Sequence, residues 1–177
     1  MCTRRDALGR IAMLGVAPWW ALPRPRVLDM VRLDDGEHWV CEWFNGVTLD
    51  QQGYEQACQA LRDRHQWTKH GVVAIAPRLL QVLWEIETAH RNEGYTGALM
   101  VYSGYRSELT NQRTEGSVPD SMHVAGSACD FHVTNVPLVV TRRLTELAPG
   151  RGGVGYYPRS NGGWIHVDVS DRREWVG

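Results

Sequence analysis

The stretch Ser121–Val133, "SMHVAGSACDFHV", places a histidine and an aspartate in one short segment with small residues between them. Its last six residues alternate in character, as expected of a β-strand in which successive side chains point to opposite faces. Asp130 and His132 fall on one face of this strand, and the apolar residues fall on the other. The segment therefore predicts a strand whose non-core face carries a carboxylate and an imidazole, shortly after His123.

A second alternating stretch, "GGWIHVDV" (162–169), lies near the end of the sequence. Trp164, His166 and Asp168 share one face of this strand, and the aliphatic residues share the other, which should be core. The polar face should then point to a cleft or to solvent. Taken singly, these residues read as ordinary surface positions. Together with the His123–Asp130 segment, they become candidates for one metal site.

A catalytic zinc site needs two or three imidazoles or carboxylates that converge, with one position left open for water. The chain has seven histidines and no HExxH sequence, so the common helical arrangement of zinc proteases is absent. Candidate ligands would therefore have to come from strands and loops. Their spacing by itself does not prove that they converge.

Outward from these two strands, the rest of the sequence reads as short strands and helices. Strands are predicted on both sides of Asp35-Gly36, within 97–107 and within 152–158, and helices from Asp50 to about His65, from Pro77 to Gly94 and from Pro137 to Pro149-Gly150. The helices come first and the later strands lie close together in sequence. This order favours an α+β domain with an antiparallel sheet.

Length and composition place the protein among globular domains. The 177 residues, with 43% hydrophobic and 22% charged, suffice for one domain with a real core and are too few for two comfortable ones. The formal net charge of -1 argues against a nucleic-acid partner held by bulk electrostatics. We expect a single domain over residues 27–177.

Residues 1–26 read as an export signal. Paired arginines at Arg4 and Arg5, in the manner of a twin-arginine signal, precede an apolar run from Ile11 to Leu22. The run is too short to cross a bilayer as a mature helix. A buried amphipathic helix is the alternative, but the run has no polar face. The protein is therefore expected to be exported, to the periplasm, and to keep no membrane span once the signal is removed.

The cysteines of the mature part give little information. Removal of the signal leaves Cys41, Cys58 and Cys129, an odd number, so at least one thiol is free. A disulfide between Cys41 and Cys58 is the one pairing to consider, and the sequence leaves it open.

A glycine-rich segment, Gly150–Gly155, matches the GxGxxG pattern of dinucleotide-binding sites. Such a site requires the pattern to follow a strand and open a helix. Here it follows a predicted helix and leads into a predicted strand. The glycines are therefore interpreted as a tight helix-to-strand connection.

Three sequence blocks resemble a known family in their order along the chain. They are "SGYRSELTN" (103–111), "SMHVAGSACDFHV" (121–133) and "GGVGYYPRSNGGWIHVDVSDRREW" (152–175). They are similar to M15-type zinc peptidases, most closely to the exported murein endopeptidase K branch. The resemblance implies the hedgehog/DD-peptidase α+β fold, with a central antiparallel sheet flanked by helices. It also implies zinc-dependent hydrolysis of the peptide cross-links of peptidoglycan.

Carried over by position, the resemblance implies that His123, Asp130 and His166 bind Zn²⁺. A zinc-bound water, with its pKa lowered towards about 7, would be the nucleophile. Arg106 would stabilise the oxyanion of the transition state or clamp a carboxylate of the stem peptide, with a structural salt bridge as the alternative.

Two serines complete the expected set. Ser121, just before His123, and Ser103, near Arg106, are candidates for contacts with the substrate. Ser103 has a bond to the backbone as its alternative role. The turn from Thr110 to Asp120 is expected to form a wall of the substrate pocket.

The general base is where the sequence departs from the family pattern. Many M15-type enzymes have an acidic residue three positions before the last histidine ligand, and here that position is Gly163. Asp168 is the nearest substitute, either as base or as a residue that orients a histidine ligand through its ring N–H. His132 is a further candidate for proton donation, although a surface role is favoured for it.

Two other functions stay open at the level of sequence. One is a D-alanyl carboxypeptidase that trims stem peptides, and the other is a cell-wall peptide-binding module without activity. The missing acid at Gly163 favours the binding module, whereas the complete ligand set and Arg106 favour an enzyme. The sequence also does not distinguish D-alanyl–diaminopimelyl from diaminopimelyl–diaminopimelyl cross-links.

Overall fold

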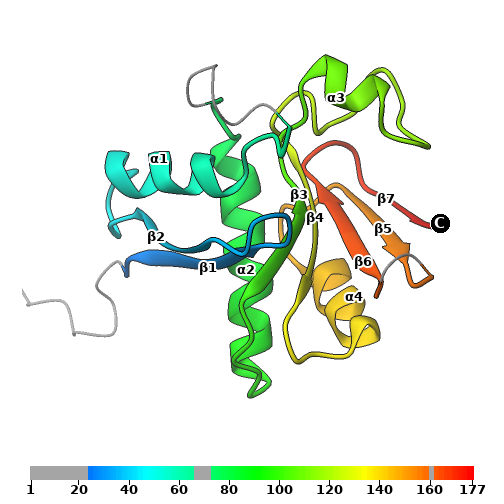
Figure 1. Cartoon of the computed structure of the whole chain (residues 1–177). Helices are drawn as coiled ribbons and strands as arrows, with labels where there is room; N and C mark the ends of the chain where they lie inside the picture. Colours follow the sequence, from blue (N-terminus) through cyan, green and yellow to red (C-terminus); the bar gives the residue numbers. More distant parts are fainter. Residues whose placement is uncertain (1–23, 66–72, 160–161) are drawn as a thin grey trace, which may run out of the picture.

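The computed structural model describes residues 24–65, 73–159 and 162–177 (Figure 1). The predicted export signal therefore lies outside the described residues, apart from its last three positions. Within the described ranges, every helix is too short or too polar to cross a membrane.

The described residues form a seven-stranded sheet, in the order β2-β1-β3-β4-β6-β5-β7, and four helices (Figure 1). The strands are β1 (Arg26–Arg32), β2 (His38–Phe44), β3 (Leu99–Ser103), β4 (Ala128–Val133), β5 (Gly153–Tyr157), β6 (Trp164–Asp168) and β7 (Arg173–Val176). The helices are α1 (Gln51–Ala60), α2 (Pro77–Asn92), α3 (Glu108–Gln112) and α4 (Leu138–Leu147).

The predicted α+β class is confirmed. The centre of the sheet is antiparallel, through the pairs β3–β4, β4–β6 and β5–β6, and so is the predicted hairpin of β1 and β2. Towards the two edges, the pairs β1–β3 and β5–β7 are parallel. The sheet is therefore mixed, and both parallel pairs join strands that are not consecutive in sequence.

The core lies between the sheet and the helices α1, α2 and α4, of which α1 packs on β1 and β2 and α2 and α4 also contact each other. The apolar side chains that the alternation assigned to the core faces of β4 and β6 are fully buried there: Cys129, Phe131, Val133, Ile165 and Val167. The opposite face of these two strands carries Asp130 and His166. The two-residue period of the strands thus sends one set of side chains into the core and the other set to the site described below.

The first helix ends earlier than predicted. α1 begins after Asp50, whose side chain accepts a hydrogen bond from the Gly53 N–H at 2.8 Å, but it ends at Ala60 rather than at about His65. The chain beyond Ala60 is needed for other contacts. The Leu61 carbonyl accepts a hydrogen bond from the Tyr105 N–H at 2.7 Å, and Asp63 accepts one from the Ser107 N–H at 2.8 Å.

Two short elements were absent from the sequence interpretation. α3 is capped by Ser107, whose hydroxyl accepts a hydrogen bond from the Thr110 N–H at 3.2 Å, and it begins the segment predicted only as a turn. β7 pairs in parallel with β5 and so extends the sheet beyond it. In the described part of the chain, Cys41, Cys58 and Cys129 are buried free thiols.

Candidate metal centre

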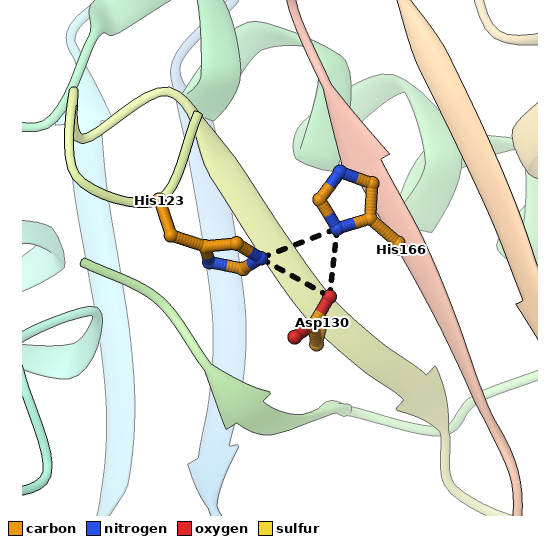
Figure 2. A group of neighbouring side chains, drawn as sticks. All are labelled: His123, Asp130 and His166. Carbon is orange, nitrogen blue, oxygen red and sulfur yellow. Dashed lines mark hydrogen bonds and ion pairs between the residues drawn. The ribbon is translucent and has the colours of Figure 1, made fainter. Parts of the chain in front are cut away.

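His123, Asp130 and His166 meet on the face of the sheet opposite the core (Figure 2). Asp130 on β4 and His166 on β6 are direct partners in the antiparallel register, so their side chains lie side by side. His123 comes from the turn that precedes β4. Each residue offers one possible ligand atom, and these atoms all lie within 4.8 Å of one another.

The distances within this cluster match the requirements of a small metal ion. Oδ1 of Asp130 lies 2.8 Å from Nδ1 of His166 and 3.3 Å from Nε2 of His123. The two histidine nitrogens are 3.2 Å apart. Ligands that bind zinc tetrahedrally at about 2.0–2.1 Å are separated by about 3.3 Å. Two imidazoles and one carboxylate also leave one tetrahedral position free, so the residues fit a catalytic Zn²⁺.

In each histidine, the ring nitrogen that points away from the cluster lies beside a hydrogen-bond acceptor. Nδ1 of His123 donates to the Gly104 carbonyl at 2.7 Å, which leaves its Nε2 as the atom with a free lone pair. Nε2 of His166 lies 3.4 Å from Oδ2 of Asp168, which leaves its Nδ1 towards Asp130. This backing of both imidazoles is typical of histidines that bind metals.

The position of the Gly104 carbonyl depends on close packing with the end of α1. A Cβ atom at Gly104 would lie 2.3 Å from the Leu61 carbonyl oxygen, closer than side chains approach backbone. Glycine is therefore required for the contact that brings the 104–107 loop to His123. The Arg106 N–H, in the same loop, donates back to the His123 carbonyl at 3.2 Å.

The electrostatics of the cluster keep Asp130 ionised. Burial alone raises the pKa of Asp130, but the charges and hydrogen bonds of His123 and His166 lower that pKa well below its usual range. Burial lowers the pKa of His166, and the hydrogen bonds to Asp130 and Asp168 outweigh it, so the pKa of His166 is raised. The cluster therefore attracts positive charge.

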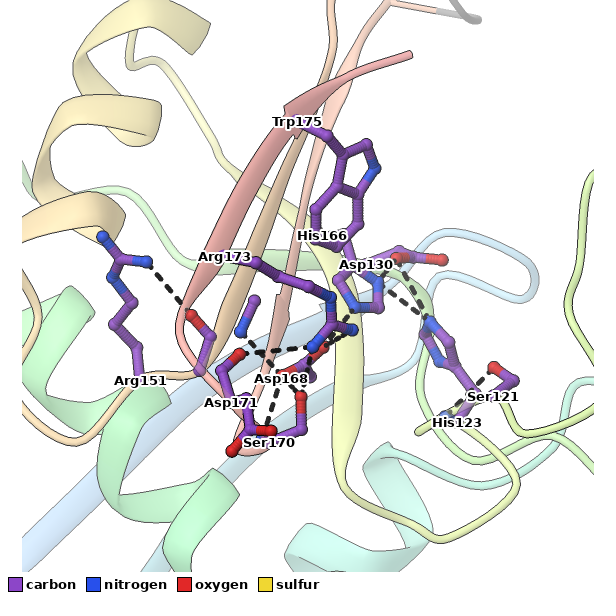
Figure 3. Close-up of polar contacts among 12 residues, drawn as sticks. Ser121, His123, Asp130, Arg151, His166, Asp168, Ser170, Asp171, Arg173 and Trp175 are labelled. Carbon is purple, nitrogen blue, oxygen red and sulfur yellow. Dashed lines mark hydrogen bonds and ion pairs between the residues drawn. The ribbon is translucent and has the colours of Figure 1, made fainter.

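Asp168 is fully buried, although it lines a cavity of about 450 Å³ together with Trp164 and His166 from the same face of β6, as the prediction of a cleft on that face required. Figure 3 shows its polar contacts. Its Oδ1 accepts hydrogen bonds from the Gly153 N–H at 2.7 Å and the Ser170 N–H at 2.9 Å. Its Oδ2 accepts one from Arg173 at 2.7 Å and faces His166. Burial raises the pKa of Asp168, but the contacts with His166, Gly153 and Ser170 lower it below its usual range.

Arg106 and the two predicted serines lie beside the cluster. Nε of Arg106 donates to Oγ of Ser103 at 2.8 Å, and its guanidinium forms an ion pair with Oδ2 of Asp130. Oγ of Ser121 accepts a hydrogen bond from the His123 N–H at 3.3 Å. Each serine is thus bonded to a residue of the cluster or to Arg106, and each also lines one of the cavities described next.

Two adjoining cavities flank the cluster. One, of about 450 Å³, is lined by His123, Asp130 and His166, and the other, of about 590 Å³, extends from Asp130 towards Arg64. The residues that line both cavities are Arg106, Thr114, Glu115, Asp130, Tyr157 and Trp164. Residues of the segment 110–120 line both cavities, as expected of a pocket wall.

Gly163 and His132 have no place in the cluster. Gly163 has a left-handed backbone, with φ of 80°, and a Cβ atom there would lie 2.5 Å from Cδ2 of Leu138. His132 packs against Tyr102, with ring centroids 5.6 Å apart, and burial lowers its pKa. It follows that no acid can be accommodated at position 163 without rearrangement, and that His132 belongs to the neighbouring row of side chains.

The family described as "Peptidoglycan L,D-endopeptidase MepK" matches residues 21–175, which is most of the chain. The chain belongs to the MepK family. The resemblance seen in three sequence blocks is thereby confirmed.

Individual MepK relatives support the same family assignment. The chain is 33% identical over 157 residues to the peptidoglycan L,D-endopeptidase MepK of Escherichia coli K12, covering 86% of this chain and 81% of the relative. The MepK of Shigella flexneri matches equally, and the probable MepK of Haemophilus influenzae is 32% identical over 160 residues, covering 88% and 81%. The similarity thus covers more than four fifths of this chain and of each relative.

Three contributors to this site were missed in the sequence. They are the Gly104 carbonyl, Arg173 and Trp175, which contact His123, Asp168 and His166 respectively. A backbone carbonyl has no sequence signal. Arg173 and Trp175 lie on β7, which has only four residues and no alternating pattern to mark it.

Proposed function

We propose that this protein is a zinc-dependent peptidoglycan endopeptidase that hydrolyses L,D peptide cross-links. The observation that carries the proposal is the convergence of His123, Asp130 and His166 in a cleft, within a chain of the MepK family. The relatives are named for the L,D specificity, which favours the diaminopimelyl–diaminopimelyl cross-link over the D-alanyl one.

The three ligands would be Nε2 of His123, Nδ1 of His166 and a carboxylate oxygen of Asp130. A bound Zn²⁺ supplies a Lewis acid for the scissile carbonyl and lowers the pKa of a water molecule to near neutrality. The chain itself keeps the two imidazoles in the required tautomers, through the Gly104 carbonyl and Asp168.

Arg106 would act on the substrate beside this cluster. Ser103 holds its Nε, and the guanidinium reaches Oδ2 of Asp130, so the side chain is fixed at the junction of the two cavities. From there its remaining N–H groups are available to a developing oxyanion or to a carboxylate of the stem peptide. Ser121 lines the same cleft and would contact the substrate near His123.

Asp168 would orient His166 rather than act as the general base. Its carboxylate is fully buried, and both of its oxygens already accept hydrogen bonds from Gly153, Ser170 and Arg173. A general base must reach the proton that it removes. The low pKa of Asp168 also makes it a weak proton acceptor.

The shape of the cleft supports an endopeptidase over the alternative of a D-alanyl carboxypeptidase. Cavity space extends on both sides of Arg106 and Asp130, as two stem peptides joined by a cross-link require. A carboxypeptidase needs room for a single terminal residue on one side. A binding module without activity would not need the backed imidazoles or Arg106.

The residues 1–26 would export the enzyme to the periplasm by the twin-arginine route, where its substrate lies. The paired arginines and the short apolar run support this proposal. With the net charge of -1, no nucleic-acid partner is proposed.

Substitution of the ligands tests the proposed function. His123→Ala and His166→Ala should each abolish stoichiometric zinc binding, measured by metal analysis of the purified protein, and the digestion of purified sacculi. A chelator should inhibit the wild type, and added Zn²⁺ should restore it. If His166→Ala keeps one zinc and digests sacculi at the wild-type rate, the proposed site is wrong.

A further inference from the structure

The glycine-rich segment that follows α4 has a structural use beyond a tight connection. Gly153 and Gly155 lie in β5, between β6 and β7, and neither has a left-handed backbone. A Cβ atom at Gly153 would lie 2.6 Å from Oδ2 of Asp168 and 3.0 Å from atoms of Arg173 and Trp175. These glycines are therefore required by the side chains of the neighbouring strands.

Gly155 lies in one cross-strand row with the metal ligands. Asp130 pairs with His166, His166 pairs with Gly155, and Gly155 pairs with Trp175. Because Gly155 has no side chain, the indole of Trp175 lies across it and reaches the imidazole of His166. A Cβ atom at Gly155 would lie 2.6–2.8 Å from three atoms of that indole, inside any real contact distance.

The indole of Trp175 contacts the ring of His166 directly (Figure 3). The ring centroids are 5.3 Å apart with an interplanar angle of 47°. Nε1 of Trp175 donates a hydrogen bond to Oη of Tyr157 at 2.8 Å, and the guanidinium of Arg173 lies over the indole at 5.3 Å from its centroid. The indole is thus held at its N–H by Tyr157 and on one face by Arg173.

These contacts restrict the imidazole of His166 from three directions. Asp130 lies at its Nδ1, Asp168 at its Nε2, and the indole of Trp175 beside the ring. The two polar contacts hold the ring nitrogens of His166 only while the ring stays between Asp130 and Asp168. The indole of Trp175, packed beside the ring, restricts its rotation away from them.

We propose that Trp175 is a positioning residue for His166, and that glycine is required at position 155 to admit its indole. The proposal rests on the proposed function, since it assumes that His166 binds the metal. Trp175 would increase metal affinity by keeping Nδ1 of His166 directed towards Asp130 and His123. The alternative is that Trp175 serves only as a wall of the 450 Å³ cavity, which it also lines.

Zinc affinity, measured by competition with a chromogenic chelator, separates these roles. Loss of a residue that orients a metal-binding histidine typically weakens metal affinity 10–100-fold. Trp175→Ala should therefore bind Zn²⁺ about 10–100-fold more weakly than the wild type. Trp175→Phe, which keeps a flat ring beside His166, should recover most of that loss. Gly155→Ala, which displaces the indole without removing it, should weaken binding as Trp175→Ala does.

The absorption spectrum of the Co²⁺-substituted protein gives a second readout. Its visible bands depend on coordination geometry, so they should shift in Trp175→Ala and return in Trp175→Phe. Trp39→Ala is the matched control, because Trp39 is a half-buried indole on β2, far along the sheet from His166, and it should change neither readout.

Three results would decide against the proposal or its basis. Unchanged zinc affinity and an unchanged Co²⁺ spectrum in Trp175→Ala, with a raised KM for cross-linked muropeptides, would make Trp175 a substrate wall and overturn the proposal. Equal losses in Trp39→Ala would point to general destabilisation and also overturn it. Failure of the wild type to bind Zn²⁺ would instead reject the proposed function itself.

Discussion

At Asp168, two opposed effects determine the state of one side chain. Removal from water favours the neutral acid, whereas four hydrogen-bond donors and the nearby imidazole favour the carboxylate. The second effect is larger, so the buried group remains charged. A buried carboxylate that is already fully hydrogen-bonded is well suited to hold a neighbour in place and poorly suited to exchange protons with a substrate.

Asp168→Asn should therefore weaken metal binding more than it slows the chemical step. The amide of the asparagine is neutral and has one acceptor oxygen, which cannot serve the donors at both Gly153 and Arg173. The side chain should therefore hold His166 less firmly. Zinc affinity should fall about 10–100-fold, with turnover recovered at saturating Zn²⁺. Digestion of muropeptides measured against Zn²⁺ concentration tests this.

The opposite pattern would assign Asp168 the role of base. In that case Asp168→Asn would bind Zn²⁺ as tightly as the wild type and would stay inactive at every Zn²⁺ concentration. Ser170→Ala is a useful companion, because it removes one hydroxyl donor to the same carboxylate, 2.8 Å away, and leaves its charge. It should produce a smaller loss of zinc affinity.

The position of a side chain could be predicted from the sequence when residues close to it in the chain determine that position. The faces of Asp130 and His166 follow from strand alternation, which is set by neighbouring residues, and the structure places them as predicted. The place of His123 in the cluster depends on the Gly104 carbonyl, held by α1, which no local pattern encodes. The burial of Asp168 depends on β5 and β7 beside it, and the sequence alone did not indicate it.

At the scale of elements, the strong periodic segments were predictable and the short ones were not. α2 begins at Pro77, and the left-handed Gly94 follows its last turn, as expected of a helix with an N-terminal proline and a C-terminal glycine. α3 and β7 have five and four residues, so they carry too little periodicity to stand out. Their places depend on contacts outside each element: the Ser107 N–H, at the start of α3, donates to Asp63, and β7 pairs with β5.

α2 also carries a buried acid that links it to β1. Glu87 is 1% exposed, and its Oε1 accepts a hydrogen bond from the Asp29 N–H at 3.2 Å and pairs with Arg91 at 3.1 Å. Its Oε2 has no hydrogen-bond partner among the described residues. Burial raises the pKa of Glu87 from 4.5 to about 7, against the opposing effect of Arg91.

This acid should make the free energy of unfolding depend on pH. Since the folded state binds the proton more tightly, the contribution of Glu87 is complete below about pH 4.5 and is lost as the pH rises through about 7. Between pH 4.5 and 7.5 the wild type should lose up to about 3 kcal/mol relative to Glu87→Gln. Urea unfolding of both proteins at each pH measures the difference.

The comparison of variant with wild type cancels the contributions that other ionisable groups make equally to both proteins. Glu42→Gln, at an exposed position on β2, is the matched control and should follow the wild type at every pH. A constant difference between Glu87→Gln and the wild type across this range would show that Glu87 keeps the same protonation state in the folded and unfolded protein.

At the scale of the whole molecule, the sheet separates two tasks. One face is covered by α1, α2 and α4 and holds the core, while the other face carries the cluster of His123, Asp130 and His166 and the aromatic row of Tyr102, Trp164 and Tyr157. Residues of the segment between α3 and β4, among them Ser121 and His123, line the 450 Å³ cavity on that second face. Two adjoining cavities that share Asp130 in their lining suit a long substrate that is cut internally.

This shape leads to a prediction about the products. With a defined pair of stem peptides joined by an L,D cross-link, the enzyme should release two monomers, and it should leave the terminal D-alanine of an uncross-linked monomer in place. A cross-linked dimer can occupy both cavities, and a monomer only one. The dimer therefore gains more binding energy in the transition state, and kcat/KM should be at least about 10-fold higher for the dimer than for the monomer. Mass spectrometry of the two digests, each with a chelator-treated control, measures this ratio. Faster release of D-alanine from the monomer than splitting of the dimer would identify a carboxypeptidase, and the second cavity would then lie outside the substrate site.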